Sequence, residues 1–201
     1  MHVKETILLI GTGKSGRLAA NPLLAGDYKL LLCDKNFMQA QEMAQELNNT
    51  GYGCVAEAME CSFDCAWEAD MILLAPAFEE QLDAARCIKA VVSQKILISL
   101  DDNANYNCNN KEEGISPNQR IDLLQQILPN TKIAVLNLVA TACDTGLQTN
   151  IIEHLAVYGR EKNTIDTVAE IFKNAGVASL KKALLPFTGS ASQPAVIDSK
   201  C

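Results

Sequence analysis

Residues 7–20 read Ile7-Leu8-Leu9-Ile10-Gly11-Thr12-Gly13-Lys14-Ser15-Gly16-Arg17-Leu18-Ala19-Ala20. This stretch is a short apolar run, then the pattern G-x-G-x-x-G, then residues that favour a helix. Gly11 permits a sharp turn out of a strand, Gly13 lets the backbone approach a pyrophosphate, and Gly16 lets the helix pack closely. The helix N-terminus adds unpaired N–H groups and a partial positive charge. The stretch therefore predicts a strand, turn and helix that bind dinucleotide phosphates.

A second apolar run, residues 30–33, ends in Asp34 about twenty residues after the glycine turn, a spacing typical of dinucleotide-binding units. A carboxylate in this place can accept hydrogen bonds from the adenosine ribose. It would also repel the 2′-phosphate of NADP, so Asp34 favours NAD, while Lys35 leaves NADP open. The cofactor-binding residues predicted in this half are Gly11, Thr12, Gly13, Lys14, Ser15, Gly16, Asp34 and Lys35.

The glycine turn allows two other interpretations. Gly13-Lys14-Ser15 looks like the end of a P-loop, but that motif needs a glycine five positions earlier, where this chain has Leu8. The NTPase interpretation fails on that residue. A glycine-rich turn that binds no nucleotide stays open as the plain alternative.

Composition limits the classes of protein to consider. The chain has 201 residues, 48% of them hydrophobic and 20% charged, as in an ordinary globular protein with a substantial core. It lacks an apolar run long enough to predict a membrane span, and residues 1–6 do not resemble a secretory signal, so we expect a cytoplasmic protein. The net charge of −7 argues against a nucleic-acid partner.

The eight cysteines form no C-x-x-C pair, and the chain has only two histidines. Cys61 and Cys65 lie four residues apart with no histidine near them, so we predict no metal site. Reduced thiols are the expected state. Cys108, in the polar segment 101–116, is the cysteine that we would test for reactivity.

Short apolar runs alternate with amphipathic stretches along the chain, which predicts an α/β fold. We expect a Rossmann-type, doubly wound and mostly parallel sheet with a short C-terminal α/β extension. The predicted units are a dinucleotide-binding domain over 1–140, a small extension over 141–186 packed on it, and a polar tail over 187–201. Pro22 should kink or shorten the first helix. The predicted strands are 7–10, 30–33, 52–55, 69–76, 95–100, 132–139, 151–158 and 180–185, and the predicted helices are 15–24, 36–47, 78–92, 117–128 and 164–175.

The chain resembles the deazaflavin-dependent NADP reductases and their dinucleotide-binding relatives. The residues that carry the resemblance are Ile10 to Gly16, Ala69 to Pro76 with the following helix around residues 82–85, the strand 95–99 and the segment 165–177. In that family a nicotinamide passes its hydride directly to a deazaflavin, and the protein mainly aligns the two rings. The resemblance implies that Ala75, Pro76 and Ala77 line the nicotinamide ribose, and that the loop after Ser99 borders the acceptor pocket.

The chain departs from the family at three places. Members that select NADP carry Ser or Thr and basic residues where this chain has Asp34. The family commonly has a histidine in the sixth strand, where this chain has Asn137. The family's terminal apolar helices are replaced by a polar tail. These differences concern the cofactor choice and the acceptor pocket.

The sequence thus predicts an oxidoreductase that uses NAD or NADP and a small-molecule partner: a deazaflavin-like, flavin-like or small carbonyl compound. A carbonyl substrate would need a proton donor. His154 is a poor candidate because it lies in a predicted strand, as a core or edge residue, and Tyr106 and Lys14 have no evident partner. No catalytic residue or metal ligand is therefore assigned. The alternative is a non-catalytic NAD(P)-binding sensor or scaffold, and a homodimer is one option for the assembly.

Overall fold

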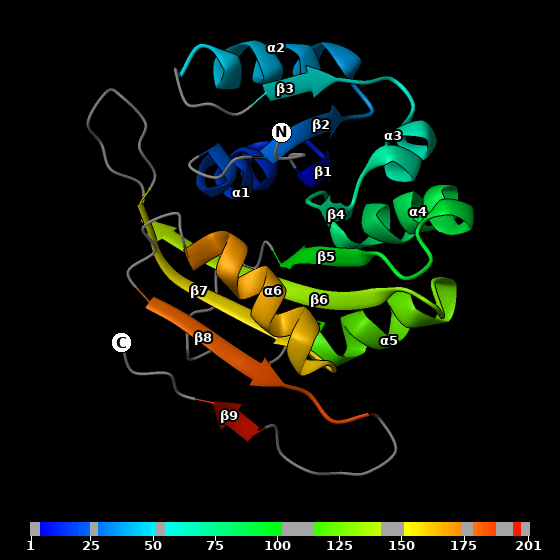
Figure 1. Cartoon of the computed structure of the whole chain (residues 1–201), viewed down its shortest axis with the longest axis vertical. Coiled ribbons are helices and arrows are strands. Elements are labelled where there is room, and N and C mark those ends of the chain that lie inside the picture. The colour runs from blue at the N-terminus through cyan, green and yellow to red at the C-terminus, as the bar shows by residue number, and fades with distance from the viewer. Residues whose placement is uncertain are drawn as a thin grey trace.

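The computed structural model describes residues 5–24, 28–50, 55–101, 115–141, 151–173, 179–187 and 195–197. Within these ranges one sheet runs in the order β3-β2-β1-β4-β5-β6-β7-β8-β9 (Figure 1). Its strands are β1 (Glu5–Ile10), β2 (Tyr28–Cys33), β3 (Val55–Ala58), β4 (Met71–Leu74), β5 (Ile96–Asp101), β6 (Lys132–Thr141), β7 (Ile151–Gly159), β8 (Ser179–Leu184) and β9 (Ala195–Ile197). The pairs among β1 to β6 are all parallel. This confirms the predicted doubly wound α/β class.

The helices cover both faces of the sheet. They are α1 (Lys14–Leu24), α2 (Phe37–Asn48), α3 (Ser62–Glu68), α4 (Phe78–Ile88), α5 (Pro117–Ile127) and α6 (Lys162–Lys173), with a 3₁₀ turn η1 (Lys89–Val91) after α4. Apolar residues of α1, α2 and α6 share one buried cluster, and those of α3, α4 and α5 share another. The molecule is therefore a three-layer α/β/α sandwich with a core on each side of the sheet.

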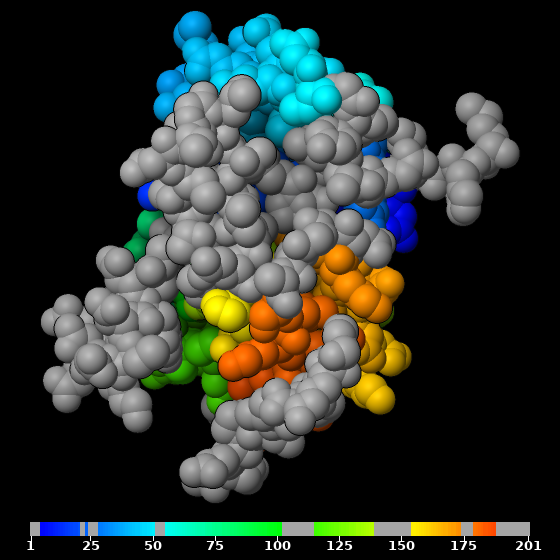
Figure 2. All heavy atoms as spheres, turned by 90° about the vertical axis from the view of Figure 1, so that its left-hand side faces the viewer, coloured from blue at the N-terminus to red at the C-terminus, as the bar shows by residue number. Residues whose placement is uncertain are grey.

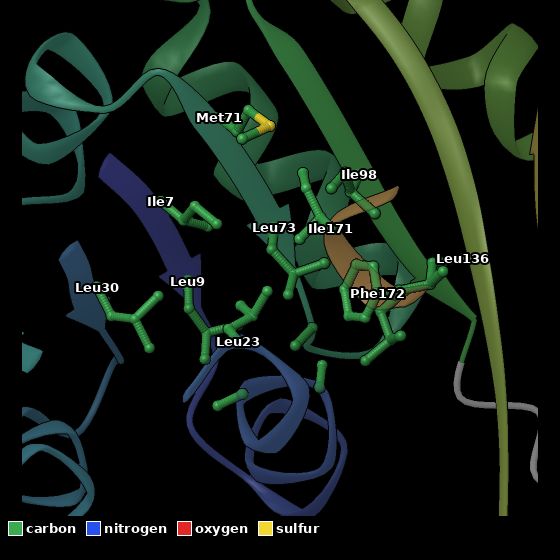
Figure 3. Packing of buried hydrophobic residues seen from close by; sticks show 14 of the residues in the cluster. Ile7, Leu9, Leu23, Leu30, Met71, Leu73, Ile98, Leu136, Ile171 and Phe172 are labelled. Atoms are coloured by element: carbon green, nitrogen blue, oxygen red, sulfur yellow. The ribbon is translucent and has the colours of Figure 1, made fainter. Parts of the chain in front are cut away.

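Strand residues alternate between the two cores. Leu9, Leu73 and Ile98 face the α1–α6 side, where Phe172 packs among them (Figure 3). All four residues of β4 are buried, as expected for a parallel strand covered on both faces. Continuous apolar runs, rather than alternating ones, are the sequence signature of such strands.

The register brings three loops to one place. Ile10, the last residue of β1, lies between Cys33 of β2 and Leu74 of β4. The loops that follow these three neighbouring parallel strands therefore begin side by side. The strand order also reverses between β1 and β4, the switch point at which open α/β sheets bind ligands beyond their carboxyl ends.

Most predicted elements lie within a few residues of the observed ones. Asn36 caps α2 as expected, its side chain accepting a hydrogen bond from the backbone N–H of Met38 at 3.2 Å. Pro22 does not shorten α1, which continues to Leu24. The third strand lies later in the chain than predicted: β3 begins at Val55. Residues 52–54 lie outside the described ranges, and so do residues 102–114 with Tyr106 and Cys108.

The C-terminal elements continue the same sheet. β7 runs antiparallel along β6, β8 is parallel to β7, and β9 pairs antiparallel with β8 inside the segment expected to be a polar tail. Figure 2 shows α2 and β3 at one end of the molecule and β8 with α6 toward the other. The division into units 1–140, 141–186 and 187–201 stays a prediction. In the part of the chain that the structure describes, every helix is too short or too polar to cross a bilayer.

Candidate dinucleotide site

The glycine turn follows β1 directly. Its three glycines differ in whether neighbouring atoms leave room for a side chain. Gly11 has a φ of +93°, and a Cβ there would lie 2.9 Å from the Pro76 ring. A Cβ on Gly16 would lie 2.0 Å from the Gly11 carbonyl oxygen. Among the described residues, a Cβ on Gly13 would meet nothing within 4 Å. The protein itself therefore demands glycine at two positions, whereas at Gly13 the space is open, as a ligand that approaches the backbone would need.

The Asp34 carboxylate fixes this turn through hydrogen bonds. Its Oδ2 accepts hydrogen bonds from the backbone N–H of Thr12 at 2.7 Å and from the Thr12 hydroxyl at 2.9 Å. Its Oδ1 accepts a third bond from the N–H of Asn36 at 2.9 Å. Burial works to raise the pKa of this carboxyl, but the bonds from Thr12 and Asn36 outweigh it and hold the pKa below its ordinary value. Asp34 is therefore an ionised clamp on the turn as well as a candidate ribose contact, a role that sequence reasoning missed.

A cavity of about 290 Å³ opens beside the turn. Its wall includes Gly11, Cys33 and Pro76, and its charged lining residues are Asp34, Lys35, Glu60, Glu80 and Asp83. Lys35 is the one cation among them, and its Nζ donates to Glu80 Oε1 at 2.7 Å, which raises the Lys35 pKa. The rim is thus strongly acidic. A cavity of about 340 Å³ at another edge, lined by Lys132 and Arg160, does not adjoin the turn.

The segment after β4 is held by a buried glutamine. Gln81, fully buried on α4, donates through Nε2 to the carbonyl oxygens of Pro76 and Leu100, both at 2.8 Å. The Ser99 hydroxyl donates to Gln81 Oε1 at 2.6 Å. One amide therefore ties the Pro76 segment to the end of β5. Nothing in the sequence distinguished Gln81 from the other polar residues of α4.

A buried ion pair lies at the end of β5, beside Asn137 of β6. Arg120 Nη2 donates to Asp101 Oδ1 at 2.9 Å, and both side chains are almost fully buried. Asn137 Nδ2 approaches the other Asp101 oxygen at 3.4 Å, and the Arg120 guanidinium lies 4.6 Å from the centre of the Phe78 ring. Nε and Nη1 of Arg120 are buried and have no hydrogen-bond partner in the part of the chain that the structure describes. The cluster thus joins α4, α5, β5 and β6 at the carboxyl edge of the sheet.

The comparisons with known proteins bear first on the glycine turn. Residues 6–102 match the family described as NADP oxidoreductase coenzyme F420-dependent. This confirms the resemblance predicted from the sequence. The matched segment contains the turn, Asp34, the Pro76 segment and Gln81, and it ends just after Asp101. Arg120 and Asn137 lie beyond it.

Solved structures show the same fold at low sequence identity. A putative F420-dependent NADP-reductase from Arthrobacter sp. FB24 is 16% identical with a TM-score of 0.63, over 88% of this chain and 83% of that one. Plasmodium falciparum pyrroline carboxylate reductase with NADP bound is 17% identical with a TM-score of 0.57, over 89% and 57%. A Myxococcus stipitatus imine reductase variant in complex with NAD⁺ is 14% identical with a TM-score of 0.63, over 90% and 55%. The chain therefore spans little more than half the length of the last two.

No curated protein sequence matches the chain. The F420-dependent family match and the Rossmann reductase neighbours together support a dinucleotide-using oxidoreductase. They name both NADP and NAD as ligands of the relatives.

The candidate proton donors are scattered: Lys14 lies within the matched segment, His154 lies beyond it, and Tyr106 lies outside the described residues. Lys14 is exposed at the start of α1. His154 lies on β7 as predicted, but it is exposed and has β6 and β8 on either side, so it is neither a core nor an edge residue. Among the described residues no group of three or more acidic, histidine or cysteine side chains could hold a metal ion.

Proposed function

We propose that the chain binds a nicotinamide dinucleotide at the glycine turn and transfers hydride between it and a second organic molecule. The observation that carries the proposal is the open space at Gly13, next to a turn that Gly11, Gly16 and Asp34 hold rigid. A pyrophosphate there would meet the N-terminus of α1 and its partial positive charge. The predicted contacts from Lys14 and Ser15 fit the same place.

The acidic cavity supports NAD in preference to NADP. The adenosine ribose would lie near Asp34, which is ionised and retains lone pairs for ribose hydroxyls. A 2′-phosphate would meet Glu60, Glu80 and Asp83 as well, and like charges brought together in a cavity repel. Lys35 is already paired with Glu80. The lining therefore adds to the preference that Asp34 alone predicts.

Hydride transfer from a nicotinamide to a deazaflavin or flavin needs alignment of the two rings rather than a protein acid or base. In this chain the Pro76 segment and the end of β5, tied together by Gln81, would form the floor beneath the nicotinamide. The second molecule would lie over the carboxyl ends of β5 and β6. The predicted roles of Ala75, Pro76 and Ala77 belong to this proposal.

The cofactor choice can be tested without disturbing the turn. Substituting Asp34→Ser would also remove the clamp on Thr12, so Glu80→Gln is the sharper variant. It frees Lys35 to meet a 2′-phosphate, and we expect NADPH affinity to rise about fivefold while NADH affinity changes little. Calorimetric titration of both cofactors measures this. Glu79→Gln, on the same helix but outside the cavity, is the matched control.

Wild-type preference for NADPH, unchanged by Glu80→Gln, would refute the cofactor assignment. The enzymatic part is tested separately, by following oxidation of bound NADH with a panel of deazaflavins, flavins and small carbonyl compounds. If none of them oxidises the bound cofactor, the non-catalytic sensor or scaffold replaces the enzyme.

A further inference from the structure

Two buried thiols meet beneath the candidate site. Cys33 is the last residue of β2, and Cys65 lies in α3, which follows β3 in the chain and lies near the end of β2 (Figure 1). Their sulfur atoms are 3.4 Å apart, and Cys33 Sγ donates a hydrogen bond to Cys65 Sγ. Both are free cysteines. The fold thus brings together two thiols that lie 32 residues apart in the sequence.

The backbone of Cys33 is hydrogen-bonded to the glycine turn. Its carbonyl oxygen accepts a hydrogen bond from the N–H of Gly11 at 2.8 Å, and the next residue, Asp34, clamps Thr12. Cys33 is also one of the residues that line the cavity beside the turn. A change at this sulfur therefore acts on the backbone that positions the first two residues of the turn.

Cys65 lies in the same helix, α3, as a residue of the cavity wall opposite Cys33. Cys65 lies one turn after Ser62, the first residue of α3, and both Ser62 and Glu60 line the cavity. A disulfide has an S–S length of about 2.05 Å, so the two sulfurs must approach by about 1.4 Å from their present 3.4 Å. Bond formation would draw the start of α3 toward the end of β2. The cavity between them would become narrower.

We propose that Cys33 and Cys65 form an oxidisable dithiol, and that its conversion to a disulfide weakens dinucleotide binding. The disulfide itself follows from the geometry alone, whereas its effect on the cofactor rests on the proposed function. Dithiols that cycle in this way are the usual form of redox-sensing cysteines in reducing compartments.

The oxidant is a peroxide, small enough to enter by the cavity that Cys33 lines. One thiolate attacks a peroxide oxygen, becomes a sulfenic acid and releases hydroxide, which is protonated to water. The second thiol then attacks the sulfenic sulfur and displaces another water. In sum, two thiols and one hydrogen peroxide give one disulfide and two waters.

The hydrogen bond between the sulfurs helps the first step. It raises the pKa of the Cys33 thiol and lowers that of Cys65, so Cys65 is the more readily ionised thiol of the pair. Cys61 and Cys87 are both exposed, and Cys87 lines the cavity whereas Cys61 does not. Cys61 is therefore the control cysteine.

Peptide mapping decides whether the disulfide forms. The reduced protein is treated with hydrogen peroxide, alkylated, and digested with trypsin and Asp-N. We expect a linked peptide that joins residues 30–33 to residues 64–69, because Asp64 separates Cys65 from Cys61. Failure to find this link, or links through Cys61 or Cys87 instead, would overturn the proposal.

Calorimetry then measures NADH affinity before and after oxidation. We expect an affinity loss of about tenfold or more, restored by dithiothreitol. Cys65→Ser, or Cys65→Ala if the serine variant folds poorly, should keep its affinity after peroxide, whereas Cys61→Ser should lose it as wild type does. A mapped disulfide with unchanged affinity contradicts the regulatory part. If the reduced protein binds no dinucleotide, the proposed function fails, while the mapping still decides the disulfide.

Discussion

Single residues in the glycine turn have separable roles. Gly16 is required by the turn, because any side chain there would collide with the Gly11 carbonyl. Gly13 is not required by any neighbour in the structure. Glycine at position 16 therefore has a structural cause, whereas glycine at position 13 is explained by the ligand of the proposed function.

This contrast gives a paired test of the site. Gly16→Ala should lower the free energy of unfolding by about 2 kcal/mol or more, because the backbone of the turn must move. Gly13→Ala should leave stability within about 0.5 kcal/mol of wild type and still reduce dinucleotide affinity strongly, because its methyl group occupies the approach to the pyrophosphate. Chemical denaturation and calorimetry on the two variants measure these effects. Wild-type affinity in a folded Gly13→Ala protein would contradict the assignment of the turn.

At the scale of elements, the site depends on how the loop after β4 is held against β5. Gln81 supplies that link through bonds to Pro76, Leu100 and Ser99. The Arg120–Asp101 pair performs a similar task between α5 and β5, with Phe78 stacked on the guanidinium. Buried polar groups of this kind fix an arrangement because leaving them unpaired costs free energy.

Gln81→Leu should therefore destabilise the protein by about 3 kcal/mol, since two carbonyl groups and a hydroxyl lose their partner. The double variant Gln81→Leu/Ser99→Ala should recover about 1 kcal/mol of this loss, because the orphaned hydroxyl is also removed. Denaturant unfolding measures both values. If the single variant is as stable as wild type, Gln81 does not hold the segment.

At the scale of the whole molecule, the C-terminal elements share a core with the N-terminal half. Phe172 of α6 is almost fully buried in the cluster that contains Leu9, Leu23 and Leu73 (Figure 3). β7 also pairs with β6, so the C-terminal strands continue the same sheet. We therefore expect one cooperative unit, although the sequence predicts separate segments over 1–140 and 141–186.

Phe172→Ala should lower stability by about 3–5 kcal/mol, because a large buried ring leaves a cavity at the sheet surface. The loss should appear in a single unfolding transition that also abolishes cofactor binding. Calorimetric melting with and without NADH measures this, and Lys173→Ala, at an exposed neighbour, should change little. Two separate transitions, with only the later one sensitive to NADH, would show instead that the predicted segments fold independently.

By itself the sequence determined the fold class and the order of most elements, and it predicted the turn proposed to bind the cofactor, because these depend on local chemistry. The G-x-G-x-x-G pattern, apolar strands and Asn36 cap act within a few residues of one another. Tertiary structure alone decided that Asp34 clamps Thr12, that Gln81 ties the Pro76 segment to β5, and that Cys33 meets Cys65. The bonds from Asp34 to Thr12, from Gln81 to β5 and between the two sulfurs join residues 18 to 32 positions apart, and only strand order and register bring such side chains together.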